Sequence, residues 1–98
     1  MNKNSAKETA RIAKDVLNVA NREGHLAVLA AIVSGFNTYD DIMQATDCTY
    51  LKVGDAVAAW KSVGLVESRK TGTKYRTIHP VSDAGVAGKV MELIFSHE

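Results

Sequence analysis

The sequence predicts a mainly α-helical domain with one small β-hairpin, an α+β fold. In most of the chain, apolar residues recur at helical spacing in segments that glycines or capping residues separate. Residues 65–78 differ, because β-branched and aromatic residues flank a glycine-containing turn there, which is typical of a hairpin. The chain has 98 residues, 46% of them hydrophobic, which is enough for one core without disulfides or metal. We therefore expect a single domain over residues 1–98.

The first helix is expected over about residues 5–23. Ser5 and Glu8 have the spacing of a capping box, in which the serine oxygen and the glutamate side chain satisfy free amides at a helix start. Ile12 and Val16 lie four residues apart and therefore share the apolar face.

The second helix is expected over about residues 25–34, and Gly35 is placed to end it. It contains the longest apolar run of the chain, LAVLAAIV, residues 26–33. This run is far shorter than the roughly 20 residues that span a bilayer, and the polar N-terminal residues do not form a signal peptide. We expect a buried helix, no membrane association and a cytoplasmic protein.

Two further helices, residues 39–45 and 50–63, are separated by a short turn. Thr38 precedes the first and Thr49 precedes the second, and threonine side chains cap helix N-termini. Gly64 is placed to end the second of them in a left-handed conformation. The apolar stripe of that helix comprises Val53, Ala56, Val57, Trp60 and Val63.

The hairpin is expected to consist of strands at residues 65–69 and 74–78. A last helix should follow over residues 83–97, capped by Ser82 or Asp83. The predicted order is therefore four helices, a hairpin and a fifth helix.

A short helix, a three-residue turn, a longer helix, a Gly-Leu-Val step and a basic hairpin occur in this order, which resembles the winged helix-turn-helix family of DNA-binding domains. The resemblance covers about residues 26–78 and is most specific in residues 38–42 and 56–66. It implies a winged helix-turn-helix fold with extra N-terminal and C-terminal helices. It also implies that double-stranded DNA is the partner, with one helix in the major groove and the hairpin, or wing, beside it.

The expected recognition helix, residues 49–63, has a face opposite its apolar stripe that carries Thr49, Tyr50, Lys52, Asp55 and Ala59. Tyr50 and Lys52 can donate hydrogen bonds to bases or phosphates, and Thr49 can contact a phosphate or a thymine methyl group. Asp55 can accept a hydrogen bond from a cytosine amino group. Arginine, the commonest base reader, is missing from this face, so one subunit would make few base contacts.

The wing concentrates positive charge. The whole chain has a net charge of only +1, which argues against a bulk polyanion binder, but residues 67–76 alone sum to +3. Such a hairpin can lie along the DNA backbone or insert a basic side chain into a minor groove. Alternatively, its basic side chains only prevent the exposed strand edges from pairing with another chain. The candidate DNA-binding residues here are Arg69, Lys70, Thr71, Thr73, Lys74 and Arg76.

The C-terminal helix has more apolar surface than a small core needs. It could cover its own core, or pair with the N-terminal helix or with the same helix of a second copy. We expect a homodimer, since helix-turn-helix dimers read two half-sites about one DNA turn apart. The candidate interface residues are Ile12, Val16, Val90, Leu93 and Ile94.

The resulting prediction is a DNA-binding transcription regulator, acting as a repressor. The sequence contains no glycine-rich phosphate loop, nucleophile elbow or triad spacing, and its three histidines lack metal-ligand spacing. We therefore expect no enzyme activity, no catalytic residue, no metal, no cofactor and no small-molecule substrate. Cys48, the single cysteine, fits a reducing compartment, and a redox role for it stays open.

A second hypothesis is a winged-helix adaptor that binds protein, or a subunit of a replication, transcription or phage-encoded assembly. The near-neutral total charge and the apolar C-terminal helix favour it. So do four acidic residues near the expected groove face, Asp40, Asp41, Asp47 and Asp55.

Overall fold

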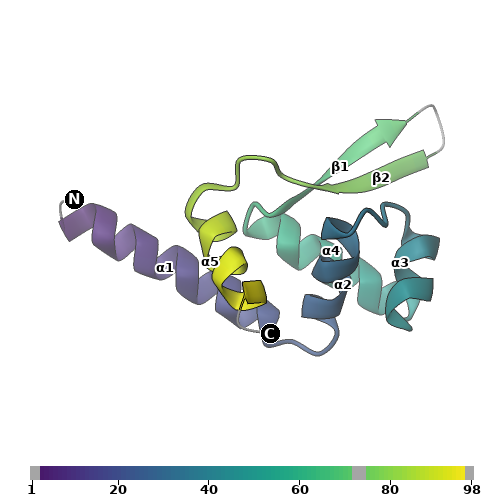
Figure 1. The fold of residues 1–98 in the computed structure, drawn as a ribbon, viewed down its shortest axis with the longest axis horizontal. Helices are drawn as coiled ribbons and strands as arrows, with labels where there is room; N and C mark the ends of the chain where they lie inside the picture. Colours follow the sequence, from purple (N-terminus) through teal and green to yellow (C-terminus); the bar gives the residue numbers. More distant parts are fainter. Residues whose placement is uncertain (1–2, 72–74, 97–98) are drawn as a thin grey trace.

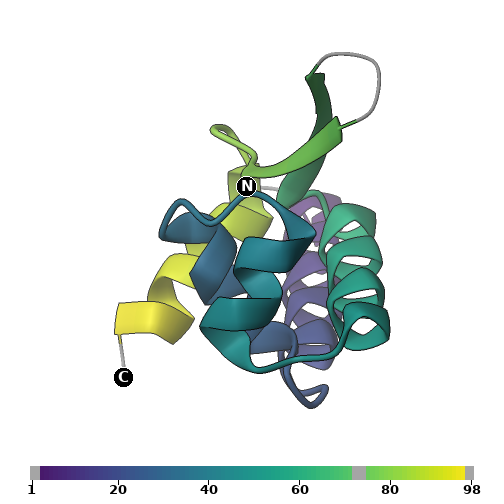
Figure 2. The same ribbon diagram turned by 90° about the vertical axis from the view of Figure 1, so that its right-hand side faces the viewer.

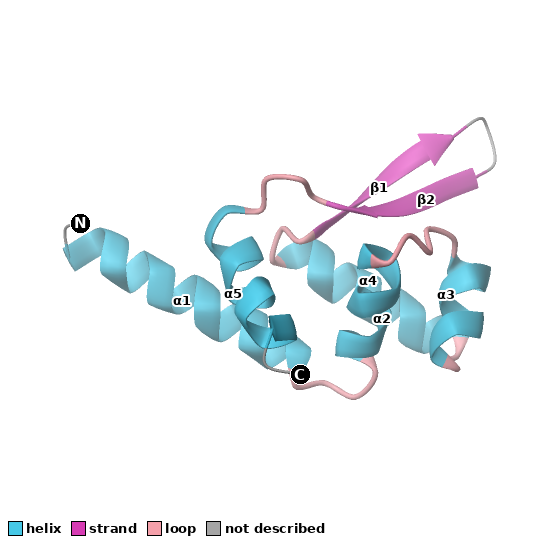
Figure 3. Cartoon of the chain, viewed as in Figure 1, coloured by secondary structure: helices cyan, strands magenta, loops and turns pink. Residues whose placement is uncertain are grey.

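The computed structural model describes the backbone of residues 3–71 and 75–96, and the side chains of residues 6–70 and 76–96. This part of the chain consists of five helices and one antiparallel hairpin, which confirms the predicted fold class (Figures 1 and 3). None of its helices is long and apolar enough to cross a membrane. The elements are α1 (Lys3–Ala20), α2 (His25–Val33), α3 (Tyr39–Thr46), α4 (Tyr50–Ser62), β1 (Val66–Thr71), β2 (Tyr75–Pro80) and α5 (Gly85–Ser96).

The core forms around α2, which packs against α1, α3, α4 and β2. Because neighbours surround α2, its sequence is apolar on nearly every side instead of along one stripe. Trp60 of α4 is fully buried, and its indole Nε1 donates a hydrogen bond to the backbone oxygen of His25 at 2.8 Å. This bond satisfies the only polar atom of the tryptophan side chain and fixes the start of α2 against α4.

Threonine side chains cap both helices of the helix-turn-helix, as the sequence predicts. The Thr38 hydroxyl accepts a hydrogen bond from the Asp41 amide at 3.1 Å, and the Thr49 hydroxyl accepts one from the Lys52 amide at 3.2 Å. Both threonines have extended backbone angles, as N-cap residues do. The starts of α3 and α4 are therefore set by local sequence.

Gly64 ends α4 in the predicted left-handed conformation, with φ at +79°. Its amide donates to the Lys61 oxygen and the Leu65 amide donates to the Trp60 oxygen, each at 3.0 Å, which is a Schellman motif. The motif satisfies two carbonyl groups at the helix end and directs the chain into β1.

Two helix starts differ from those expected. The helical backbone of α1 already includes Lys3, so Ser5 lies inside the helix and cannot be its N-cap, which requires non-helical angles. The helix also ends at Ala20, and a turn follows before α2. At the other end of the chain, α5 begins at Gly85 and not at residue 83.

The strands are each one residue longer than predicted, because β1 continues two residues further toward the turn and β2 continues two residues past Ile78 to Pro80. Its register joins Val66 to Pro80, Ser68 to Ile78 and Lys70 to Arg76. These pairs share one face of the hairpin, since every second residue of a strand points to the same side. The other face carries Glu67 opposite His79 and Arg69 opposite Thr77.

The base of the hairpin is tied to the helical body. Val66 and Ile78 are buried, so the inner face of the hairpin contributes to the core. The Ile78 amide donates to the Asn37 oxygen at 2.8 Å, and the Val81 amide donates to the Leu65 oxygen at 2.9 Å. The hairpin therefore rises from the helices on a fixed base (Figures 1 and 2).

Candidate nucleic-acid interface

The outer face of α4 carries a narrow stripe formed by Leu51, Asp55 and Ala58. The three residues follow at intervals of four and three, so they lie along one side of the helix, and all three are exposed. The opposite side of α4 is buried in the core. Figure 2 shows α4 along one side of the molecule, with the hairpin rising above it.

The N-terminal end of α4 presents Thr49 and Tyr50. Thr49 is exposed, although its hydroxyl oxygen already accepts the capping bond from the Lys52 amide. Tyr50 is also exposed, and its ring centre lies 5.2 Å from that of Tyr39 in a tilted arrangement. Burial raises the pKa of Tyr39, and the neighbouring Tyr50 adds to this shift. Tyr39 thus packs against Tyr50, while the Tyr50 side chain remains accessible.

Lys52 points to a different surface from the stripe. Its ammonium Nζ lies 3.4 Å from the Glu23 carboxylate in the turn between α1 and α2. Its aliphatic chain covers Gly24, where an added Cβ would lie only 3.1 Å from Lys52 Cδ. Lys52 is therefore placed beside the α1–α2 turn, where its ammonium group pairs with Glu23.

The hairpin separates its basic residues onto two faces. Lys70 and Arg76 pair directly across the strands, on the face that is buried at the hairpin base and exposed near its tip. Within the described residues neither makes an ion pair. Arg69 lies on the other face, where its guanidinium Nη2 is 2.6 Å from Glu67 Oε1. The structure thus brings together two uncompensated positive charges, Lys70 and Arg76.

The turn of the hairpin lies outside the described residues, and with it the predicted contacts Thr73 and Lys74. Thr71 is described only in its backbone, which pairs with Tyr75. Of the predicted wing residues, the structure therefore places the side chains of Arg69, Lys70 and Arg76.

Several solved structures have a similar fold. An ArsR-like transcriptional regulator from Rhodococcus sp. RHA1 matches with a TM-score of 0.71 and 15% identity, over 92% of this chain and 85% of that one. Reduced HlyU from Vibrio cholerae N16961 matches with a TM-score of 0.72 and 15% identity, over 95% of this chain and 96% of that one. The sequence matches no protein-family model and no curated protein.

The third match is a homodimeric winged helix-turn-helix DNA-binding domain from Mycobacterium bovis, described as a possible ArsR-family transcriptional regulator. It has a TM-score of 0.72 and 22% identity, over 99% of this chain and 87% of that one. The chain has the winged helix-turn-helix fold. In this fold α3 and α4 are the helix-turn-helix, and the β1–β2 hairpin is the wing. The resemblance inferred from the sequence is confirmed at the level of the fold.

The predicted interface residues lie on α1 and α5, which pack against each other. Val16 has no exposed surface, so its side chain is used entirely within its own chain. Ile12, Val90 and Ile94 are half-buried and pack against the core, whereas Leu93 is 61% exposed. Leu93 is therefore the predicted residue with the most surface left for a second copy.

The sequence predicts Ala59 on the outer face of α4, but the structure buries Ala59 and exposes Leu51 and Ala58 there instead. An apolar residue in a helix is normally assigned to the core, yet Leu51 precedes Val53 by two positions and so falls on the opposite side. The two-position offset of Leu51 from the buried stripe would have predicted that its side chain is exposed.

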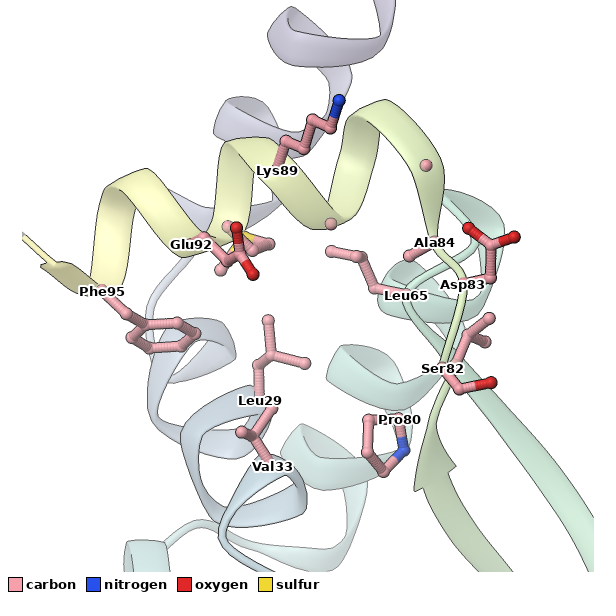
Figure 4. A pocket seen from close by; sticks show the side chains of 14 residues that line it. Leu29, Val33, Leu65, Pro80, Ser82, Asp83, Ala84, Lys89, Glu92 and Phe95 are labelled. Atoms are coloured by element: carbon pink, nitrogen blue, oxygen red, sulfur yellow. The ribbon is translucent and has the colours of Figure 1, made fainter.

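A separate cavity of about 590 Å³ lies between α2, α5 and the segment that follows β2. Leu29, Val33 and Phe95 face it, and the Glu92 carboxylate lies at its side, while Lys89 points away (Figure 4). Its walls are largely apolar and it presents no cation inward, so it is distinct from the candidate nucleic-acid interface. In the described part of the chain, no three histidine, cysteine or acidic residues gather in a metal-binding arrangement.

Proposed function

We propose that the chain is a sequence-specific regulator of transcription that binds double-stranded DNA. The observation that carries this proposal is the pairing of Lys70 with Arg76 near the tip of the wing, where both side chains are exposed. Like charges placed directly opposite each other destabilise a hairpin, so a stable fold gains nothing from this pair. A polyanion that lies against the wing would turn the pair into a favourable contact.

In the proposed complex the N-terminal half of α4 enters the major groove. The groove is wide enough for a helix, and α3 braces α4 from behind through the short turn at Asp47. Thr49 and Tyr50 at the helix start would contact the phosphates that border the groove, and Asp55 would face the bases. The wing would follow the adjacent backbone or minor groove through Lys70 and Arg76, with Arg69, Thr71, Thr73 and Lys74 adding to the contact. Lys52, which pairs with Glu23, would reach DNA only by leaving that partner.

We further propose that the chain acts as a homodimer through α1 and α5. The exposure of Leu93 supports this, and so does the homodimeric state of the Mycobacterium bovis domain of the same fold. Ile12, Val90 and Ile94 would border the contact. A dimer would read two half-sites, and a repressor needs only to occupy its site to block transcription. Leu93→Glu should halve the mass measured by light scattering, from twice 10.6 kDa to 10.6 kDa.

Salt-dependent binding to duplex DNA tests the main proposal. The double variant Lys70→Gln/Arg76→Gln should make the slope of log K against log salt shallower by about 1.8, because each phosphate contact contributes about 0.9. Lys89→Gln on α5 removes one charge away from the interface and should leave the slope unchanged. Absence of binding by the unaltered chain at low salt, or equal slopes for all variants, would refute DNA binding by this surface.

A protein-binding adaptor is the second candidate function. The carboxylates of Asp40 and Asp41 in the first turn of α3 and of Asp55 on α4 are all exposed, and they would repel DNA phosphates. Purification of the tagged chain with one stoichiometric protein, resistant to nuclease treatment, would favour this function over DNA binding.

A further inference from the structure

Leu51 is the most exposed of the large apolar side chains in the described part of the chain. It is 77% exposed and lies in the first turn of α4, on the side of the helix opposite the buried core residue Val53. Water disfavours such an exposed leucine, and the fold does not need it, because the buried stripe of α4 is already complete without it. The N-terminal turn of a recognition helix is also the part that comes closest to base edges.

The rest of the outer stripe has an unusual composition for a surface that reads DNA. One turn after Leu51 comes Asp55, and Ala58 continues the same side of the helix. The two lysines of α4 leave this stripe, since Lys52 pairs with Glu23 and Lys61 Nζ lies 3.2 Å from the Ser68 hydroxyl. The stripe thus offers methyl groups and one carboxylate, and no positive charge.

This composition matches two features of the major groove. The thymine methyl group is the apolar feature of the groove, and the cytosine amino group donates to carboxylates. Guanine, by contrast, is usually read by arginine or lysine, which the stripe lacks. A carboxylate among bases also requires that phosphates be kept at a distance, and the basic wing supplies the backbone contacts elsewhere.

We propose that Leu51 determines specificity by packing against a thymine methyl group, with Asp55 accepting a hydrogen bond from a cytosine amino group nearby. The four residue steps from Leu51 to Asp55 span about 6 Å of helix. Base pairs are about 3.4 Å apart, so the two contacts fall one or two steps apart in each half-site. This inference rests on the proposed DNA-binding function and names the bases that α4 reads.

The test begins with duplexes selected by the unaltered chain from a random library. Each thymine of the half-site is then replaced by uracil, which removes only the 5-methyl group. At one position or more, this replacement should weaken binding of the unaltered chain about fourfold, the value of one buried methyl group. In Leu51→Ala the same replacement should have no effect, because the methyl group has lost its partner. Val33→Ala is the matched control, an exposed apolar residue on α2, outside α4 and outside the proposed dimer contact, that should keep the full uracil penalty.

The Asp55 contact is tested on the same duplexes. Replacement of the cytosine near the sensitive thymine should weaken binding of the unaltered chain at least about fivefold, and Asp55→Asn should remove that preference. The inference is overturned if uracil is tolerated at every position, or if Leu51→Ala retains the penalty. Those results would leave DNA binding itself intact. Failure of the unaltered chain to select any DNA would instead refute the proposed function, and this inference with it.

Discussion

Replacement of Lys70 by glutamine should stabilise the fold while it weakens DNA binding. Lys70 and Arg76 are both exposed and directly opposed across the two strands. Opposed like charges cost roughly 0.2 to 1 kcal/mol in such pairs, so Lys70→Gln should raise the free energy of unfolding by about that amount. For a domain of this size the melting temperature should rise by about 1 to 8 °C.

Thermal unfolding followed by circular dichroism measures this effect at low salt and again at 1 M salt. High salt shortens the screening length to about 3 Å, so the gain in stability should disappear there. The salt slope of DNA binding should become shallower by about 0.9, the contribution of one phosphate contact. Lys89→Gln changes the net charge equally and should alter neither property. A Lys70→Gln variant that melts lower at low salt would show that the reasoning about the charge pair is wrong.

Three further predictions concern the scaffold. Trp60→Phe removes the 2.8 Å bond to the buried His25 oxygen and should cost about 1 to 3 kcal/mol in urea unfolding, with the helical circular dichroism spectrum retained. Gly64→Ala should cost about 1 to 2 kcal/mol because φ is +79° there, whereas Gly54→Ala within α4 should stabilise by about 0.5 to 1 kcal/mol; equal effects would contradict the assigned cap. Burial, aided by Arg22, lowers the pKa of His25 below 6.5, so the unfolded chain binds the proton more readily. Stability should therefore be complete above pH 6.5 and fall as the pH drops below it, and His25→Leu should flatten this part of the pH profile; an unchanged profile would rule His25 out as its cause.

The parts of the fold that depend on local sequence were predictable. Thr38, Thr49 and Gly64 act through bonds to residues within four positions, and each has the predicted role. Ser5 is the exception, since a capping pattern is effective only where the helix begins, and the helical backbone already includes Lys3.

The candidate site was less predictable because its side chains depend on partners distant in sequence. The residues around Lys52 in the sequence do not indicate its partner, Glu23. The turn between α1 and α2 brings the Glu23 carboxylate to 3.4 Å from Lys52 Nζ. The strand register likewise decides that Lys70 faces Arg76, while Arg69 shares the other face with Glu67. Composition revealed that the hairpin is basic, but the division of its charges required the three-dimensional pairing.

The anchored base of the wing has a consequence for how this domain can diverge. Ile78 and Val81 hold the base through backbone bonds to Asn37 and Leu65, so changes beyond Lys70 leave the base in place. Insertion of two residues in each strand would lengthen the wing by about 6.6 Å and preserve both the pairing and the face of each later side chain. Insertion of a single residue in one strand alone would turn the later side chains to the opposite face. The length of the wing can therefore evolve in discrete steps, independently of the helices from which it extends.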